Sequence, residues 1–235
     1  MRILTQSAEL IRRAADKLLA QDCLLCGAGS AGAILCAACA DDLPRLPAAL
    51  CPRCALPTPL GEVCGRCLSK PPSFDATIAA FRYGFPLDKL VQSFKYAHRL
   101  ALGNYFGEQI AGLAQELEVD FLLPLPLHPL RLRERGFNQA QELARSISRL
   151  RGWPIDARMC SRTRHTPAQA ALPWRERAKN VRGAFYCAAD LAGKRIALVD
   201  DVMTTGASLD ECARTLKLHG AASVTLLVVA RALPA

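Results

Sequence analysis

Four pairs of cysteines with C-x2-C spacing, all between residues 23 and 67, constrain the fold of this chain more than any other feature. The first two pairs recur after a shift of 28 positions, so the segment is an internal repeat of the form C-x2-C-x9-C-x2-C. Four thiolates per repeat are the ligand set of one tetrahedral zinc ion. The sequence therefore predicts two structural zinc sites, Cys23/Cys26/Cys36/Cys39 and Cys51/Cys54/Cys64/Cys67. Interleaved pairing between the two repeats is the alternative.

Prolines and hydropathy divide the chain into three parts. The pair Pro71-Pro72 marks a boundary, which predicts a double zinc ribbon over residues 22–72 and a second domain over residues 73–235. Apolar residues in 1–21 recur at helical spacing, which predicts an amphipathic helix packed on the protein, with a membrane-surface or partner helix as the alternative. No apolar run is long enough to cross a bilayer, so we expect no membrane span. Zinc-binding rather than disulfide-bonded cysteines indicate a cytoplasmic protein.

Apolar strands and amphipathic helices alternate in the second domain. The periodicity predicts strands over 74–84, 119–125, 183–187, 195–199 and 224–229, and helices over 86–97, 101–117, 137–150 and 206–219. A polar, Arg-rich loop is expected over 162–182. This alternation indicates an α/β fold, a largely parallel sheet flanked by helices.

The most specific motif runs from Arg195 to Ser208. An apolar strand leads into two adjacent acids and then into a small, hydroxyl-rich turn that opens a helix. Such a turn offers backbone N–H groups, hydroxyls and the positive end of a helix dipole to a phosphate monoester. The adjacent acids can accept hydrogen bonds from ribose hydroxyls. The predicted ligand-binding residues are Asp200, Asp201, Thr204, Thr205, Gly206, Ala207 and Ser208. The alternative is a capping box from Ser208 to Glu211 at an ordinary helix start.

A second block, from Leu123 to Gln139, combines a strand end, several arginines and a glycine turn ahead of a helix. Its donors suit a pyrophosphate group, and a solvated basic loop is the alternative. The candidates on this side of the site are Leu125, Pro126, Arg135 and Arg164.

The segment from Val199 to Ser208 resembles the phosphoribosyl pyrophosphate (PRPP) motif of type I phosphoribosyltransferases. The cysteine pairs, the Leu123–Gln139 block, the Arg162–Gln169 string and this motif occur in the order seen in the ComF family of competence proteins, including its GntX-like members. The resemblance implies a double zinc ribbon fused to a type I phosphoribosyltransferase fold, with a link to DNA uptake in natural transformation. It also implies that Asp200 and Asp201 hold the ribose hydroxyls, that residues 204–208 hold the 5′-phosphate, and that magnesium accompanies PRPP.

One departure limits the catalytic inference. Purine-salvage relatives of the fold use an acid at the position of Thr204 as a general base, and this chain has no carboxylate there. The sequence thus indicates transfer of a phosphoribosyl group to an unidentified acceptor, with no catalytic residue assigned. Two alternatives remain: a regulatory or vestigial PRPP site in a nucleic-acid-handling protein, and a zinc-dependent adaptor without chemistry.

Positive charge is concentrated in one stretch. Residues 121–187 hold 13 basic and 4 acidic side chains, which accounts for the whole formal net charge of +9. A basic segment with an aromatic side chain inside it predicts binding of single-stranded DNA, in competition with PRPP, and competence-machinery proteins are the other expected partners. The residues expected to contact DNA are Arg131, Arg133, Arg162, Arg164, Trp174, Arg175, Arg177 and Lys179.

Overall fold

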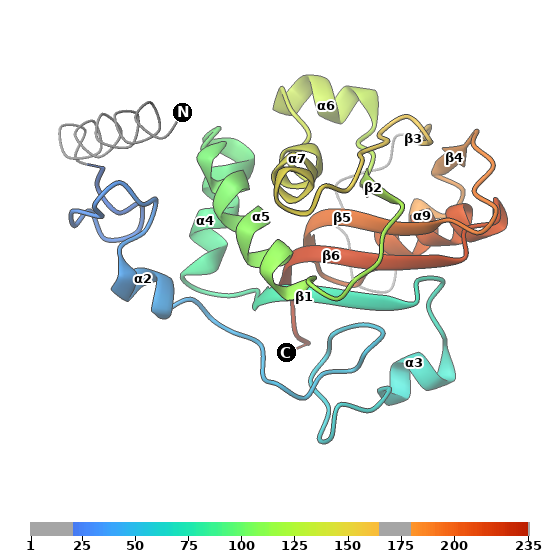
Figure 1. The fold of residues 1–235 in the computed structure, drawn as a ribbon, viewed down its shortest axis with the longest axis horizontal. Coiled ribbons are helices and arrows are strands. Elements are labelled where there is room, and N and C mark those ends of the chain that lie inside the picture. Colours follow the sequence, from blue (N-terminus) through green and yellow to red (C-terminus); the bar gives the residue numbers. More distant parts are fainter. Residues whose placement is uncertain (1–20, 165–179, 235) are drawn as a thin grey trace, which may run out of the picture.

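A computed structural model describes residues 21–164 and 180–234 of the chain (Figure 1). The helix predicted over residues 1–21 lies outside the described residues, except for its last position. Most of the Arg-rich loop, including Trp174, Arg175, Arg177 and Lys179, also lies outside them. Within the described residues, no helix is both long and apolar enough to span a bilayer.

The centre of the fold is a parallel sheet of four strands in the order β1-β6-β5-β2. The strands are β1 (Ala76–Arg82), β2 (Phe121–Pro124), β5 (Arg195–Met203) and β6 (Ser223–Arg231). A separate antiparallel pair consists of β3 (Cys160–Arg162) and β4 (Phe185–Cys187). The α/β class with a largely parallel sheet is therefore confirmed.

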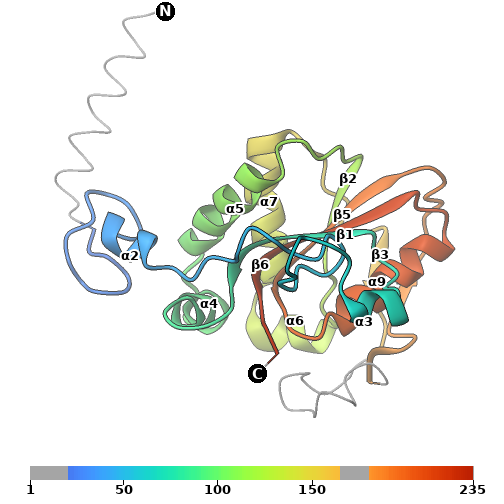
Figure 2. The ribbon, with the colours of Figure 1, turned by 90° about the horizontal axis from the view of Figure 1, so that it is seen from below.

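Helices cover both faces of this sheet (Figures 1 and 2). The helices α4 (Leu87–Tyr96), α5 (Ala101–Leu113) and α7 (Gln139–Arg151) pack on one face, and α9 (Ala207–Leu218) packs on the other. Successive residues of a strand point to opposite faces, so Leu198 joins the core under α9 while Val199 joins the core under α5 and α7. Both cores are apolar, which explains the unbroken hydrophobic runs of β5 and β6.

The cysteine-rich segment runs along the free edge of β1. The Arg82 N–H donates to the Pro44 carbonyl, and the Thr77 N–H and hydroxyl donate to the carbonyls of Pro52 and Arg53. These bonds cover a strand edge that would otherwise expose unpaired backbone groups. The short helices that carry the last cysteine of each repeat, α2 (Ala37–Asp41) and α3 (Gly65–Ser69), lie at opposite ends of this edge, and α3 lies beside α9 (Figures 1 and 2).

Most predicted elements are confirmed to within a few residues, but three features were missed. The Leu123–Gln139 block contains a helix, α6 (Pro129–Arg135), where the sequence analysis expected only basic side chains and a turn. Pro129 starts this helix, the His128 side chain accepts from the Leu130 N–H, and Gly136 ends it with a φ of 81°. Arg162, expected to begin a loop, instead ends β3. The short helices α2 and α3 were also unexpected.

Candidate functional site

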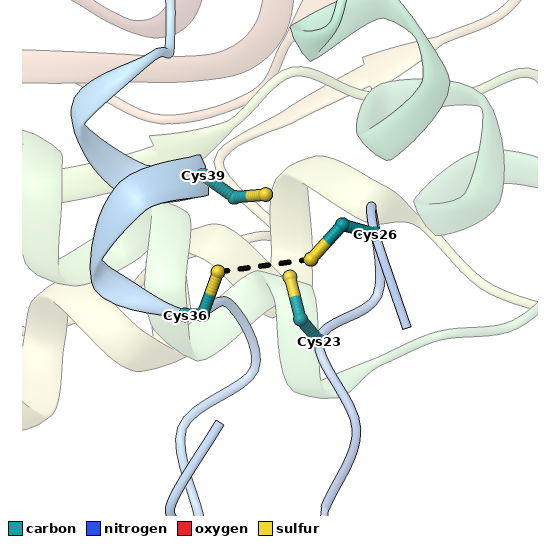
Figure 3. A group of neighbouring side chains, drawn as sticks. All are labelled: Cys23, Cys26, Cys36 and Cys39. Carbon is teal, nitrogen blue, oxygen red and sulfur yellow. Dashed lines mark hydrogen bonds between the residues drawn. The ribbon is translucent and has the colours of Figure 1, made fainter. Parts of the chain in front are cut away.

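Each cysteine repeat forms its own cluster. In both clusters the four sulfur atoms lie within 4.8 Å of one another, and the groups are Cys23/Cys26/Cys36/Cys39 and Cys51/Cys54/Cys64/Cys67. Figure 3 shows the four side chains of the first cluster pointing toward a common centre. The grouping follows the sequence repeats, so the interleaved alternative is wrong.

The sulfur geometry fits zinc. A tetrahedral site with Zn–S bonds of about 2.3 Å places its sulfurs about 3.8 Å apart. The Cys26 and Cys36 sulfurs are 3.8 Å apart, and those of Cys54 and Cys64 are 3.6 Å apart. Burial opposes ionisation of Cys23 and Cys51, but backbone N–H groups of the knuckles outweigh it. They lower the pKa of Cys23 to about 6 and that of Cys51 to about 7. Both clusters are therefore arranged as zinc tetrathiolate sites.

The two acids near the end of β5 have different environments. Asp201 is 3% exposed, accepts from the Val202 N–H at 2.7 Å, and lies 2.8 Å from the Lys95 ammonium group on α4. Asp200 precedes it in β5 and lines the turn that leads to α9. Burial and the neighbouring Asp201 charge raise the pKa of Asp200 to about 8.

Asp200 borders a hollow of about 60 Å³ formed by the turn between β5 and α9. Its lining residues are Asp200, Val202, Met203, Thr204, Gly206, Ala207, Ser208 and Leu209. The hollow is the size of a phosphate group and lies at the N-terminus of α9, where the helix dipole favours anions. The structure thus brings Asp200 together with most of the predicted phosphate-binding residues, while Asp201 faces Lys95 instead.

Glycine is required at position 206. Its φ is 79°, and a Cβ atom there would lie 2.8 Å from the Met203 methyl group. The Thr205 hydroxyl accepts from the Ala207 N–H at 3.1 Å and so closes the turn from within. These contacts fix the backbone that surrounds the hollow.

The capping-box alternative for Ser208 and Glu211 is wrong. Helix α9 starts at Ala207, and Gly206 rather than Ser208 holds the N-cap position. The Glu211 carboxylate accepts from the Gly183 N–H at 2.7 Å and pairs with Arg214 at 2.7 Å, so it does not reach back to the helix start. The N-cap residue Gly206 has no side chain to cap α9, and the N–H of its first residue, Ala207, donates to the Thr205 hydroxyl instead.

The pyrophosphate-side candidates lie in two places. Leu125 and Pro126 follow β2 directly and are buried, and the Leu125 carbonyl accepts from the Asn138 side chain at 3.1 Å. Arg135 ends α6 and lines a hollow of about 130 Å³ together with Lys95, Tyr96, His98, Arg131 and Glu134. Arg164 is exposed and donates to the Arg182 carbonyl at 3.1 Å, away from this hollow. Arg135 is thus the candidate that the fold brings nearest to the Lys95–Asp201 pair.

Basic residues expected to bind DNA are distributed over two elements near the carboxylates. Arg131 and Arg133 belong to α6, and Arg131 pairs with Glu134 at 3.4 Å. Arg162 lies over the Phe185 ring on β4; burial lowers the pKa of its guanidinium, and the Asp200 charge opposes that shift. Arg131 and Arg162 therefore lie near Asp200, whereas Arg149 and Arg151 of the same basic segment bind the Asn104 side chain and the Gln115 carbonyl.

Three functional candidates escaped the sequence analysis: Lys95, Arg66 and Arg231. Lys95 stands four residues after Val91, on the apolar stripe of a helix, and a lysine at such a position signals a buried partner. Arg231 ends the largely apolar strand β6, and its side chain is 0% exposed, so its guanidinium group requires several hydrogen-bond acceptors. Arg66, between two zinc ligands, has no comparable signal in the sequence.

Comparisons with known proteins match both halves of the chain. The family described as double zinc ribbon domain matches residues 14–68, and the phosphoribosyl transferase domain matches residues 123–233. DNA utilization protein YhgH of Escherichia coli (strain K12) is 32% identical, over 85% of this chain and 91% of that protein. Competence protein F of Haemophilus influenzae is 31% identical, over 84% of this chain and 90% of that protein.

A solved structure, the glutamine phosphoribosylpyrophosphate amidotransferase from B. subtilis complexed with ADP and GMP, superposes with a TM-score of 0.42. It is 17% identical and covers 58% of this chain and 30% of its own chain. The two curated relatives are similar over nearly their whole length, and both halves of the chain match the expected domains. The chain belongs to the ComF family of competence proteins, in which a double zinc ribbon precedes a phosphoribosyltransferase domain.

Proposed function

We propose that the chain is a cytoplasmic PRPP-binding protein that transfers a phosphoribosyl group to an unidentified acceptor during the handling of incoming DNA. The observation that supports this proposal is the phosphate-sized hollow bordered by Asp200 and by the N-terminus of α9. Residues 204–208 would hold the 5′-phosphate, and Asp200 would accept hydrogen bonds from ribose hydroxyls. Carboxylate oxygens at Asp200 also suit the magnesium ion that accompanies PRPP.

Transfer proceeds by displacement at C1 of the ribose. The nucleophile of the acceptor forms a bond to C1, the bond from C1 to the pyrophosphate oxygen breaks, and pyrophosphate leaves with that electron pair. Negative charge grows on the leaving group, and fixed cations that face it lower the barrier. Arg135 and Arg131 on α6, with Arg162 on β3, are the described side chains suited to this role.

The test is release of pyrophosphate from PRPP and magnesium in the presence of bases, nucleosides and oligonucleotides, with identification of the ribosylated product. An Asp200→Asn variant should lose this release while it keeps the wild-type circular dichroism spectrum. Asp190→Asn is the matched control, because Asp190 lies in the loop before β5 and its carboxylate accepts from the Ala192 N–H at 3.0 Å. Binding of PRPP without turnover of any acceptor would favour a regulatory PRPP site.

A second candidate function is binding of single-stranded DNA, supported by the concentration of positive charge between residues 121 and 187. Phosphate neutralisation releases counterions, so affinity should fall steeply with salt and depend little on sequence. The Arg131→Gln/Arg133→Gln variant should bind DNA more weakly with a shallower salt dependence, and PRPP should compete with DNA. This function would be refuted if the wild type, this variant and the Arg175→Ala/Arg177→Ala/Lys179→Ala variant all bound DNA with equal affinity.

A further inference from the structure

Arg231 connects the second cysteine repeat to the phosphate loop, here defined as residues 203–208. Its side chain is fully buried at the end of β6. Its Nε atom donates to the Cys54 carbonyl at 2.8 Å, and its Nη1 atom donates to the carbonyls of Met203 at 2.9 Å and Thr204 at 2.5 Å. One guanidinium group thus binds the backbone of a zinc knuckle and the backbone of the phosphate loop.

Arg66 makes a second connection between the same two parts. It lies on α3, between the zinc ligands Cys64 and Cys67, and its Nη2 atom donates to the Thr205 carbonyl at 2.9 Å. Arg231 and Arg66 therefore donate hydrogen bonds to three successive carbonyls of the phosphate loop, those of Met203, Thr204 and Thr205.

The orientation of these carbonyls determines where the loop directs its N–H groups. In a trans peptide the C=O and N–H bonds of one unit point in opposite directions. Because the carbonyls of residues 203–205 turn toward the arginines, the N–H groups of Thr204, Thr205 and Gly206 turn the other way. That is the side open to a bound phosphate, so the two arginines preorganise the anion-binding face of the loop.

The second repeat can hold these arginines in place only when its own backbone is fixed. Cys54 supplies the carbonyl bound by Arg231, and Cys64 and Cys67 bracket Arg66; all three are members of the second cluster. A zinc tetrathiolate carries a formal charge of about −2, which two adjacent guanidinium groups balance. Cys51, Cys54 and Cys67 also share a hydrophobic core with Met203 and Leu209.

The first repeat has different neighbours. Cys23 and Leu35 pack in the core under α4 and α5, and Arg45 lies over the Phe81 ring at 4.4 Å. The Arg45 side chain also donates to the Gln109 side chain on α5 at 3.1 Å. The two metal sites are equivalent in sequence but differ in their relation to the ligand site.

We propose that Arg231 and Arg66 are positioning residues that couple the second four-cysteine site to the phosphate loop, so that zinc binding at that site and PRPP binding strengthen each other. This inference rests on the proposed PRPP-binding function. Coupling between two binding equilibria is reciprocal, so it can be measured in two ways. One is the change in PRPP affinity when zinc is lost, and the other is the change in zinc release when PRPP binds.

The test uses the full chain loaded with two zinc ions, with PRPP and magnesium as ligand. Cys64→Ser removes the second zinc site, and Cys36→Ser removes the first at the equivalent position of the repeat. We expect the PRPP Kd, measured by calorimetry, to rise at least about tenfold in Cys64→Ser and less than about twofold in Cys36→Ser, since a lost charge-assisted hydrogen bond costs about that factor or more. PRPP should slow the release of one of the two zinc ions to a chromophoric chelator and leave the other unchanged.

A second variant, Arg66→Gln, tests the same coupling if Cys64→Ser fails to fold. Arg66 is exposed, and its replacement leaves both cysteine clusters intact. Its PRPP Kd should rise about fivefold or more, and PRPP should slow zinc release less than in the wild type; Arg53→Gln, on the same ribbon, is the control. Wild-type PRPP affinity in Arg66→Gln, or zinc release that PRPP does not alter, would overturn this inference alone. Failure of the wild-type protein to bind PRPP would overturn the proposed function as well.

Discussion

The Lys95 ammonium group lies 2.8 Å from the Asp201 carboxylate, and this ion pair joins the end of α4 to the ligand-facing end of β5. Asp201 is nearly inaccessible to solvent, with its side chain 4% exposed. Burial alone would lower the pKa of Lys95, but the Asp201 charge outweighs it and raises that pKa. The ion pair therefore favours the charged form of Lys95.

Loss of Lys95 should destabilise the fold. We expect Lys95→Met to lower the free energy of unfolding by about 3 kcal/mol, because Asp201 stays buried without its partner. Addition of Asp201→Asn should restore part of that loss, since the uncompensated charge is then removed. Denaturant unfolding measures both effects, with Lys89→Met, an exposed lysine of the same helix, as the control. Equal stability of Lys95→Met and Lys89→Met would contradict this account of the pair.

The raised pKa of Asp200 predicts a pH dependence of stability. Between the unfolded pKa of about 3.9 and the folded pKa of about 8, the folded protein binds one more proton than the unfolded chain. The free energy of unfolding of the wild type should therefore fall as pH rises through this window, by at most about 1.4 kcal/mol per pH unit. The Asp200→Asn variant has no titrating carboxyl group at this position, so its free energy of unfolding lacks this pH-dependent contribution.

The stability of Asp200→Asn relative to the wild type should accordingly increase with pH and level off above about pH 8. Urea unfolding of both proteins from pH 5 to pH 9 provides the comparison. A difference that is constant over this range would show that Asp200 titrates alike in the folded and unfolded states.

Gly206→Ala should impair the phosphate loop. The φ of 79° costs a residue with a Cβ atom about 1–2 kcal/mol, and that atom would also displace the Met203 side chain. We expect PRPP affinity to fall about tenfold or more. Gly112→Ala is the matched control, because Gly112 lies in α5 with a negative φ and open space around it, so stability should be unchanged or rise by up to about 1 kcal/mol. Equal PRPP affinity in both variants would mean that the turn tolerates a side chain.

The two cysteine clusters predict two zinc ions per chain. Metal analysis of carefully reduced protein should give a ratio of two, and chelation should lower the temperature of unfolding, since structural zinc contributes folding free energy. A ratio of one or zero would contradict the assignment of both clusters.

Much of the fold could be predicted because its signals are local. The apolar runs of β5 and β6 and the periodicity of α4 and α7 lie within single segments, and the zinc clusters follow from a repeat of fixed spacing. Strands β5 and β6 extend beyond their predicted ends because parallel pairing continues, as between Met203 and Arg231. The residues at those ends are polar, so the hydropathy pattern did not indicate that the strands continue.

The contacts that hold the site residues in place could not be predicted, because they join segments that are distant in the sequence. Asp201 and Lys95 are far apart in the sequence, as are Arg231 and Cys54. Adjacent acids in a motif look equivalent, and only the folded structure shows that Asp200 lines the hollow while Asp201 pairs with Lys95 on α4. Helix α6 has start and stop signals at Pro129 and Gly136, but none of its residues is buried, so no apolar periodicity indicated it.

The central claim is that the turn between β5 and α9 binds PRPP, and calorimetric titration of the zinc-loaded wild type with PRPP and magnesium tests it most directly. We expect saturable binding at one site per chain, weaker binding of ribose 5-phosphate, and a loss of about tenfold or more in affinity in Asp200→Asn with its circular dichroism spectrum unchanged. No saturable binding by the wild type, or equal affinity in Asp200→Asn, would contradict the account.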